Sequence, residues 1–123
     1  MVALGFGRVI WAVYPGARGG GKPRPMILLT PRPEIARTGR SLAVACSTDF
    51  AEPLRDNEVL IPTYADSRHC PTGLRSRTVA ICNWIDEVTV AKIRPEDRGG
   101  LVPRDVMKAI CDKIGIPLSS DRG

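Results

Sequence analysis

The sequence is poor in the side chains that usually hold metals. Its 123 residues include a single histidine, His69, and four cysteines at positions 46, 70, 82 and 111. No two cysteines form a Cys-x-x-Cys pair, whereas structural zinc sites depend on such pairs or on several histidines. We therefore expect no metal site and no cofactor.

Three of the cysteines lie within apolar patterns and are predicted to be buried thiols. Cys70 is different, because it stands beside His69 and before Pro71. This placement leaves a Cys–His nucleophile pair open. Neighbouring side chains in an extended chain point to opposite sides, which argues against that pair.

The chain also lacks a long apolar segment. No uninterrupted apolar run approaches the roughly 20 residues that cross a bilayer as a helix. The first six residues show neither the basic region nor the long apolar core of a secretory signal. We expect a cytoplasmic protein that folds as one domain over residues 1–123, with a core that needs no disulfides.

Acidic side chains are scarce in the first third of the chain. Residues 1–40 carry seven basic side chains against Glu34 alone, residues 41–85 sum to −1, and residues 86–123 balance, which gives a net charge of +5. Arginine outnumbers lysine fourteen to four, and its planar fork suits phosphate. The basic third is either a solvated surface or a patch for a polyanion. Charge alone does not separate a nucleic acid from an acidic protein.

Short apolar segments between turn-rich loops predict a mainly β protein. Six strands are predicted, over residues 6–14, 25–30, 40–47, 59–61, 77–83 and 88–93. Residues 15–23 and 31–38 are predicted to be loops, and Gly99-Gly100 breaks the strand pattern. The segments 77–83 and 88–93 are close enough to form a hairpin or one bent ribbon.

One helix is predicted near the end of the chain, over residues 103–114. Pro103 suits the first turn, and Gly115 suits the position after the last turn. An apolar stripe that we expect to pack on the sheet is formed by Val106, Met107, Ile110 and Ile114. Because nothing reads as strand–helix–strand, these elements predict a small, strongly bent β-barrel with a C-terminal helix.

Two polar clusters stand at the ends of predicted strands. Arg24 opens the strand 25–30, and Ser47 and Thr48 close the strand 40–47. A guanidinium and a hydroxyl that meet in space can hold a phosphodiester. Structural roles stay open as well, because Arg24 can pair with a carboxylate and Thr48 can bond the backbone of a turn before Asp49.

The Gly-rich segment before Arg24 does not predict a nucleotide-triphosphate site. A Walker loop needs Ser or Thr after its lysine and then a helix. Here Gly19-Gly20-Gly21-Lys22 is followed by Pro23 and by a predicted strand. We reject that interpretation.

The order of short motifs resembles that of the MazF/PemK family of toxins from bacterial type II toxin–antitoxin systems. It covers approximately residues 5–115, through Gly7-Arg8-Val9-Ile10-Trp11, the Gly-rich loop, Lys22-Pro23-Arg24-Pro25, Thr48, Ile61-Pro62, Thr72-Gly73-Leu74 and Gly99-Gly100-Leu101. The ordered set carries the specificity, since each motif is short. The resemblance implies an SH3-like (CcdB/MazF-type) β-barrel, usually a homodimer, that cleaves single-stranded RNA without a metal.

Carried over residue by residue, the resemblance places the family's arginine on Arg24 and its hydroxyl on Thr48, with Ser47 as the neighbouring possibility. Its Gly-Leu step falls on Gly73-Leu74, where the match indicates a structural turn. The expected reaction is attack by the RNA 2′-OH, which gives a 2′,3′-cyclic phosphate and a 5′-OH. Arg24 would stabilise the charge on phosphorus.

The general base of this reaction has no clear candidate in the sequence. An arginine pKa is too high for easy proton transfer, and an unperturbed hydroxyl is a poor base. His69 has suitable chemistry, and both His69 and Ser47 are kept as open candidates for an acid–base or proton-relay role.

The resemblance also implies partners. Arg18 and Lys22, in the basic loop 15–23, are predicted to contact RNA or the acidic tail of a cognate antitoxin. Two other functions stay open. One is a non-catalytic barrel that binds an antitoxin or another protein, and the other is a gyrase-directed toxin on the same fold.

Overall fold

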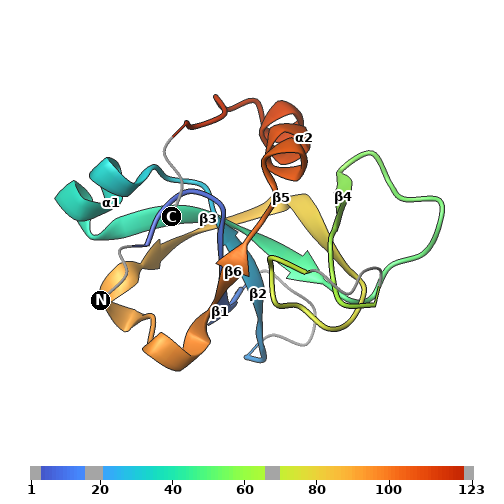
Figure 1. Cartoon of the computed structure of the whole chain (residues 1–123), viewed down its shortest axis with the longest axis horizontal. Coiled ribbons are helices and arrows are strands. Elements are labelled where there is room, and N and C mark those ends of the chain that lie inside the picture. Colours follow the sequence, from blue (N-terminus) through green and yellow to red (C-terminus); the bar gives the residue numbers. More distant parts are fainter. Residues whose placement is uncertain (1–3, 16–20, 66–69, 121–123) are drawn as a thin grey trace.

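The computed structural model describes residues 4–15, 21–65 and 70–120 (Figure 1). Its strands are β1 (Arg8–Val13), β2 (Pro23–Leu28), β3 (Arg40–Ser47), β4 (Glu58–Ile61), β5 (Thr78–Thr89) and β6 (Arg98–Leu101). Its helices are α1 (Arg32–Thr38), α2 (Arg104–Ile114) and the short 3-10 turns η1 (Val90–Lys92) and η2 (Pro95–Asp97).

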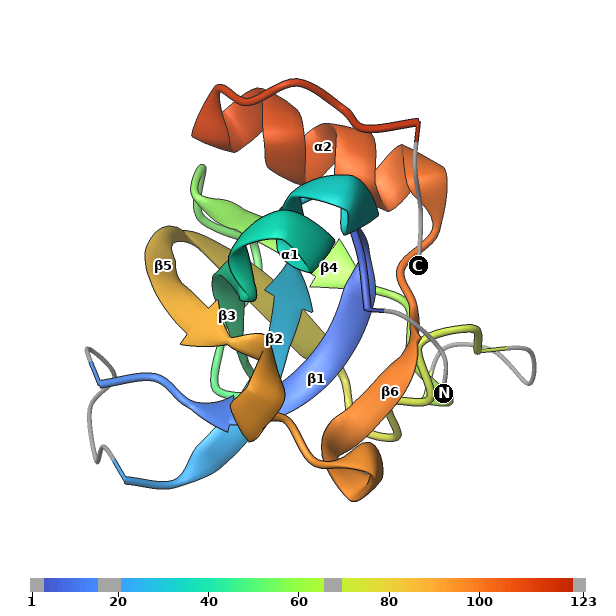
Figure 2. The ribbon, with the colours of Figure 1, turned by 90° about the vertical axis from the view of Figure 1, so that its left-hand side faces the viewer.

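The six strands form one antiparallel sheet in the order β4-β5-β3-β2-β1-β6. The sheet curls strongly into a half-barrel, and β5 bends through it (Figure 2). The predicted fold class, mainly β with a C-terminal helix, is confirmed. In the described strands the curl leaves β4 and β6 as the two edges of the sheet.

Side chains alternate between two faces of the sheet. On one, which we call the α2 face, Val9, Ile27, Val44 and Cys46 share a buried cluster with residues of α2. On the other, the α1 face, Ile10, Met26, Leu28, Ala43 and Ala45 cluster with Ile35 of α1. Because successive strand residues point to opposite faces, strand parity decides which cluster a side chain joins.

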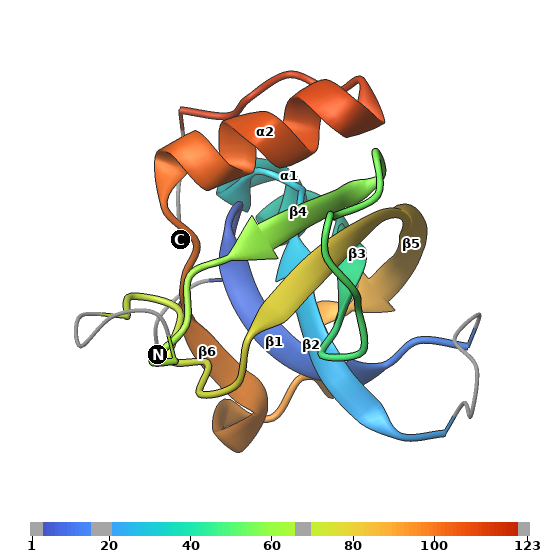
Figure 3. The ribbon, with the colours of Figure 1, turned by 90° about the vertical axis from the view of Figure 1, so that its right-hand side faces the viewer.

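The predicted helix at the C-terminal end is confirmed as α2. It follows Pro103 and ends at Gly115, whose φ of 85° is in the left-handed region. Met107 and Ile110 are fully buried against the sheet. Figure 3 shows α2 lying across the end of the half-barrel beside β4.

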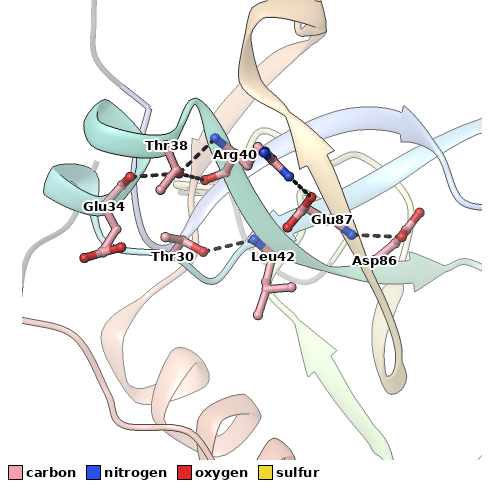
Figure 4. A network of polar contacts seen from close by, with 7 residues as sticks. All are labelled: Thr30, Glu34, Thr38, Arg40, Leu42, Asp86 and Glu87. Atoms are coloured by element: carbon pink, nitrogen blue, oxygen red, sulfur yellow. Dashed lines mark hydrogen bonds and ion pairs between the residues drawn. The ribbon is translucent and has the colours of Figure 1, made fainter.

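The prediction of a loop over residues 31–38 is wrong, because this segment contains α1. Gly39, with φ 72°, ends the helix, and the Thr38 hydroxyl accepts the Arg40 N–H at 3.2 Å (Figure 4). The Arg40 Nη1 then lies 3.3 Å from a carboxylate oxygen of Glu87 on β5. Two prolines, at positions 31 and 33, concealed a helix start, where proline is well tolerated.

The predicted strands 77–83 and 88–93 are one strand, β5, followed by η1. Of the two alternatives, the structure therefore has the bent ribbon. The Gly99-Gly100 pair does not end the strand pattern as predicted, since it lies within β6.

Those glycines let a loop cover the outer side of β6. The Gly100 N–H donates to the Thr72 carbonyl at 3.0 Å, and the Leu101 N–H donates to the Pro71 carbonyl at 2.9 Å. A Cβ on Gly100 would lie only 1.7 Å from the Pro71 carbonyl oxygen. The absence of a side chain is thus what allows this close approach.

Candidate functional site

Arg24 lies on β2 at the rim of a cavity of about 730 Å³. The wall combines cations, carboxylates, a hydroxyl and aromatic rings. It is formed by Arg24, Ser47, Asp49, Phe50, Ala51, Pro53, Arg55, Glu58, Ile81 and Trp84. A cavity of this size is in the range of small-molecule sites, so it is large enough for a nucleotide.

The register of β2 and β3 decides which hydroxyl accompanies Arg24. Met26 pairs with Ala45 and Ile27 with Val44, and Arg24 and Ser47 each lie two residues beyond the Met26–Ala45 pair. Directly opposite residues point to the same face of a sheet. Residues two apart on a strand also share a face, so Arg24 and Ser47 lie on the α1 face, and both line the cavity.

Thr48 lies on the other side of the sheet. It is exposed and lines a separate cavity of about 260 Å³, together with Trp11, Pro25 and Leu74. The structure therefore does not bring Thr48 into the cavity of Arg24. The catalytic role predicted for Thr48 stays a prediction, and Ser47 is the hydroxyl residue that shares the cavity of Arg24.

The Arg24 guanidinium has no acceptor among the described residues. Its Nε is buried without a hydrogen-bond partner, and Arg24 takes part in none of the ion pairs within residues 4–15, 21–65 and 70–120. The alternative that Arg24 pairs with a carboxylate at the strand entrance is thus not what these residues show. A buried donor without an acceptor costs about 1–3 kcal/mol, which an acidic ligand would remove.

Stacked aromatic rings hold the guanidinium in place. The Arg24 Cζ lies 5.5 Å from the ring centroid of Trp84. Trp84 in turn stacks on Tyr14, with centroids 5.4 Å apart and planes 22° apart. The cation–π contact fixes the position of the guanidinium and does not occupy its hydrogen-bond donors.

A bulge in β5 presents Trp84 to this site. Between the pairs Val44–Ile85 and Cys46–Ala80, the single β3 residue Ala45 is opposite four residues of β5. Bulges turn a side chain out of the regular alternation. Regular strand periodicity gives no signal for such a bulge, so the sequence alone does not reveal this position of Trp84.

Ser47 is fixed by the turn that follows it. It is 9% exposed, and its Oγ accepts the Asp49 N–H at 3.0 Å. The contact from this Oγ to the Asp49 carbonyl is 3.4 Å, long for a hydroxyl donor. The Ser47 proton can therefore be given to a better acceptor in the cavity. The hydrogen bond to the turn backbone that was expected from Thr48 is made by Ser47.

The remaining predicted site residues are placed as follows. Lys22 is exposed in the bend before β2, two residues from Arg24. Arg18 and His69 lie outside the described residues. Gly73, with φ 76°, forms the predicted turn before Leu74.

The four cysteine thiols are free and buried. Burial raises the pKa of Cys46, Cys82 and Cys111 above the ordinary thiol range, so these three stay protonated at neutral pH. The Cys70 Sγ lies 2.9 Å from the Thr72 Oγ1, inside the turn that leads to Leu74. In the described part of the chain, no three His, Cys, Asp or Glu side chains are arranged to hold a metal ion. Within that part, no helix is long and apolar enough to cross a membrane.

Comparison with known proteins adds a fold relationship. No protein-family model and no curated protein sequence matches the chain. Among solved structures, the chain is similar to MazF (Form-I) from Deinococcus radiodurans, with a TM-score of 0.70 and 20% identity over 94% of this chain and 96% of that one. The chain has the fold of the MazF toxins.

Two complexes show the same MazF fold. The D. radiodurans MazE-MazF structure (Form-III) matches with a TM-score of 0.68 and 20% identity, over 93% of this chain and 94% of that one. A mycobacterial endoribonuclease in complex with its cognate antitoxin matches with a TM-score of 0.57 and 17% identity, over 97% and 100% of the two chains. The resemblance predicted from short motifs is thereby confirmed at the level of the fold.

Proposed function

We propose that this chain is a MazF-type toxin, an endoribonuclease that cleaves single-stranded RNA without a metal. The phosphodiester binds at Arg24. The RNA 2′-OH attacks the adjacent phosphorus, and the products are a 2′,3′-cyclic phosphate and a 5′-OH. The metal-free route rests on the RNA itself, which supplies the nucleophile.

The observation that carries this proposal is the unpaired guanidinium of Arg24. Its Nε is buried and has no acceptor in the described residues, and Trp84 holds the group at the rim of the cavity. A phosphate oxygen would supply the acceptor, and the guanidinium fork can bind two oxygens at once. Hydrogen bonds of this kind strengthen as charge develops on the phosphorane-like transition state.

A hydroxyl on the neighbouring strand complements the cation. We propose that Ser47 donates its proton to a phosphate oxygen beside Arg24, and we keep Thr48 as the second candidate for this role. Lys22 extends the cationic surface next to β2. Arg18 and His69 stay in the proposal on their sequence alone, as an RNA contact and an acid–base candidate.

The proposed partners follow from the same fold. Structures with the MazF fold are solved with MazE or with a cognate antitoxin. We propose that an acidic antitoxin segment competes with RNA for the basic surface near Arg24, that the active unit is a homodimer, and that it acts in the cytoplasm.

The test is cleavage of a long single-stranded RNA by the purified protein in excess EDTA. Wild type should cut, and the 3′ ends should carry a cyclic phosphate. Arg24→Ala should lower kcat/KM by about 100- to 1000-fold. Arg37→Ala is the matched control, because Arg37 is an exposed arginine that pairs with Glu34 at 2.7 Å on α1.

Two results would contradict the proposal. If Arg24→Ala cuts as fast as wild type, the site is wrong. If wild type cuts no single-stranded RNA, the endoribonuclease function is wrong. The remaining alternatives are then a non-catalytic barrel that binds an antitoxin and a gyrase-directed toxin.

A further inference from the structure

The cavity contains two carboxylates, and the proposed reaction lacks a proton acceptor. Arg24 and Ser47 account for phosphate binding, and neither is a good base at neutral pH. The described part of the cavity wall carries only Asp49 and Glu58 as acidic side chains. These two carboxylates are therefore the candidate proton acceptors.

Glu58 is held in a fixed orientation. The Arg55 N–H donates to the Glu58 Oε1 at 2.8 Å, and the Glu58 N–H donates to the Arg55 carbonyl at 3.0 Å. These two bonds close a turn at the start of β4 and fix one carboxylate oxygen. The other oxygen has no hydrogen-bond partner among the described residues.

The strand register directs Glu58 toward the cavity. Glu58 pairs with Ile81 of β5, and paired residues in an antiparallel sheet project to the same face. Ile81 also lines the cavity. The Glu58 side chain is half-buried, so its position is defined by packing as well as by hydrogen bonds.

Glu58 also keeps its charge available. Among the described residues no Lys or Arg side chain forms an ion pair with it, and Arg24 has no carboxylate partner either. The cavity thus contains a cation on β2 and an anion on β4 that form no ion pair with other described residues. A ribonucleotide offers a matching pair of groups, because its phosphate is an anion and its adjacent 2′-OH is a proton donor.

Asp49 is the weaker candidate. Its side chain is exposed in the segment after β3, and its backbone N–H is the group that fixes Ser47. No hydrogen bond to its carboxylate is found in the described residues. An unfixed, solvated carboxylate is a poor means of placing a proton acceptor within hydrogen-bond reach of one hydroxyl.

We propose that Glu58 is the general base of the proposed RNA cleavage. Its carboxylate takes the proton of the 2′-OH while the 2′-oxygen bonds to phosphorus. The bond from phosphorus to the 5′-oxygen breaks, and that oxygen takes a proton from water. The proton on Glu58 then neutralises the resulting hydroxide, so no water is consumed. This inference rests on the proposed endoribonuclease function.

Glu58→Gln and Asp49→Asn form a matched pair for the test. In Glu58→Gln the side-chain amide oxygen can still accept the Arg55 N–H, so the turn is retained. A cut site is first mapped on a long RNA, and a short oligonucleotide around it is then used for kinetics. The same oligonucleotide with a 2′-deoxy sugar at the cut site reports binding without cleavage.

Glu58→Gln should lower kcat by about 100-fold or more, which is the usual contribution of a general base. Binding of the 2′-deoxy strand should change by less than about threefold. Asp49→Asn should lower kcat by much less than Glu58→Gln does, because it retains the backbone N–H that fixes Ser47. A carboxylate base works only when ionised, so wild-type kcat/KM should fall at acidic pH, and this acidic limb should be absent in Glu58→Gln. The other charged groups that line the same cavity are Arg24, Asp49 and Arg55.

The outcomes separate this inference from the proposed function. If wild type does not cut and Arg24→Ala therefore cannot be compared, the proposed function has failed. If wild type cuts and Arg24→Ala does not, but Glu58→Gln retains kcat and the acidic limb, Glu58 is not the base. An altered sequence preference with unchanged kcat also overturns the inference, since Glu58 would then read a nucleobase.

Discussion

Arg24 and Ser47, on adjacent strands, lie on the same face of the sheet and line one cavity. This relationship follows from the pairing of Met26 with Ala45, two residues away on each strand. It places a cation and a hydroxyl in one cavity. Thr48, one residue further along, belongs to the other face.

Ser47→Ala should therefore impair cleavage more than Thr48→Ala does. A hydrogen bond to a charged group contributes about 1.5–3 kcal/mol, which corresponds to a loss of roughly 10- to 100-fold in kcat/KM for Ser47→Ala. The kcat/KM of Thr48→Ala should stay within about threefold of the wild-type value, because this variant retains the proposed hydrogen bond from Ser47 to the phosphate. Single-turnover cleavage of one oligonucleotide by both variants gives the comparison. The reverse order would restore Thr48 as the catalytic hydroxyl.

The Trp84 ring should act through the position of Arg24. Trp84→Phe keeps an aromatic face under the guanidinium and should retain most activity. Trp84→Ala removes the cation–π contact, worth about 0.5–2 kcal/mol, and should lower kcat/KM by roughly 2- to 30-fold. Trp11→Ala is the control, since Trp11 is a partly exposed tryptophan that lines the cavity of Thr48. Equal losses for Trp84→Ala and Trp11→Ala would argue against a specific contact with Arg24.

The sequence was sufficient for most of the fold because local signals agreed with the final structure. Pro103, Gly115 and an apolar stripe marked α2 correctly, and short alternating segments marked the strands. The helix α1 was missed because its segment, with prolines 31 and 33, reads as a loop. The continuity of β5 was left open because bending depends on the strands that flank it.

The site was predicted only in part for a related reason. Arg24 was identified from its place before an apolar strand. The choice between Ser47 and Thr48 depended on the register of β2 and β3, which are joined through α1. A two-residue hairpin turn fixes the register of the strands that it joins, but the connection between β2 and β3, which contains α1, does not. The positions of Trp84 and Glu58 depend on their pairing with β3 and β5, and no local sequence pattern indicates the irregular segment of β5.

The buried thiols should make the protein less stable at alkaline pH. Burial raises the pKa of Cys46, Cys82 and Cys111 in the folded state. For a raised pKa the stabilisation is complete below the unfolded-state pKa, about 8.5 for cysteine, and is lost as the pH rises above it. The free energy of unfolding should therefore fall above about pH 8.5, by up to about 1.4 kcal/mol per pH unit for each thiol.

Urea unfolding under reducing conditions at pH 7, 8, 9 and 10 measures this slope. Cys46→Ala should show a shallower decline than wild type, because one buried thiol no longer titrates in the unfolded chain. A free energy of unfolding that stays constant from pH 8 to pH 10 in the wild type would contradict the burial of these thiols.

Gly100→Ala should destabilise the fold through the covered edge of β6. The new methyl group would meet the Pro71 carbonyl at 1.7 Å, so either β6 or the loop that covers it must move. We expect a loss of about 2–4 kcal/mol in the free energy of unfolding, as for other strongly overpacked positions. Gly21→Ala is the control, because its φ is 95° but nothing lies within 4 Å of the new Cβ. It should lose about 1–2 kcal/mol through its backbone conformation alone, and an equal loss in both variants would mean that the Pro71 contact is unimportant.

The bulge in β5 separates the pairing of β5 with β3 from the placement of the Trp84 side chain beside Arg24. Up to Ala80 and from Ile85 onward, β5 is tied to β3 by ordinary pairs, while the four residues between them face only one residue of β3. A substitution at Trp84 can therefore change the side chain that supports Arg24 and leave the β3–β5 pairs on both sides of the bulge unchanged. The freedom is confined to the position of Trp84, because Ile81 in the same bulge pairs with Glu58 and Cys82 belongs to the buried core.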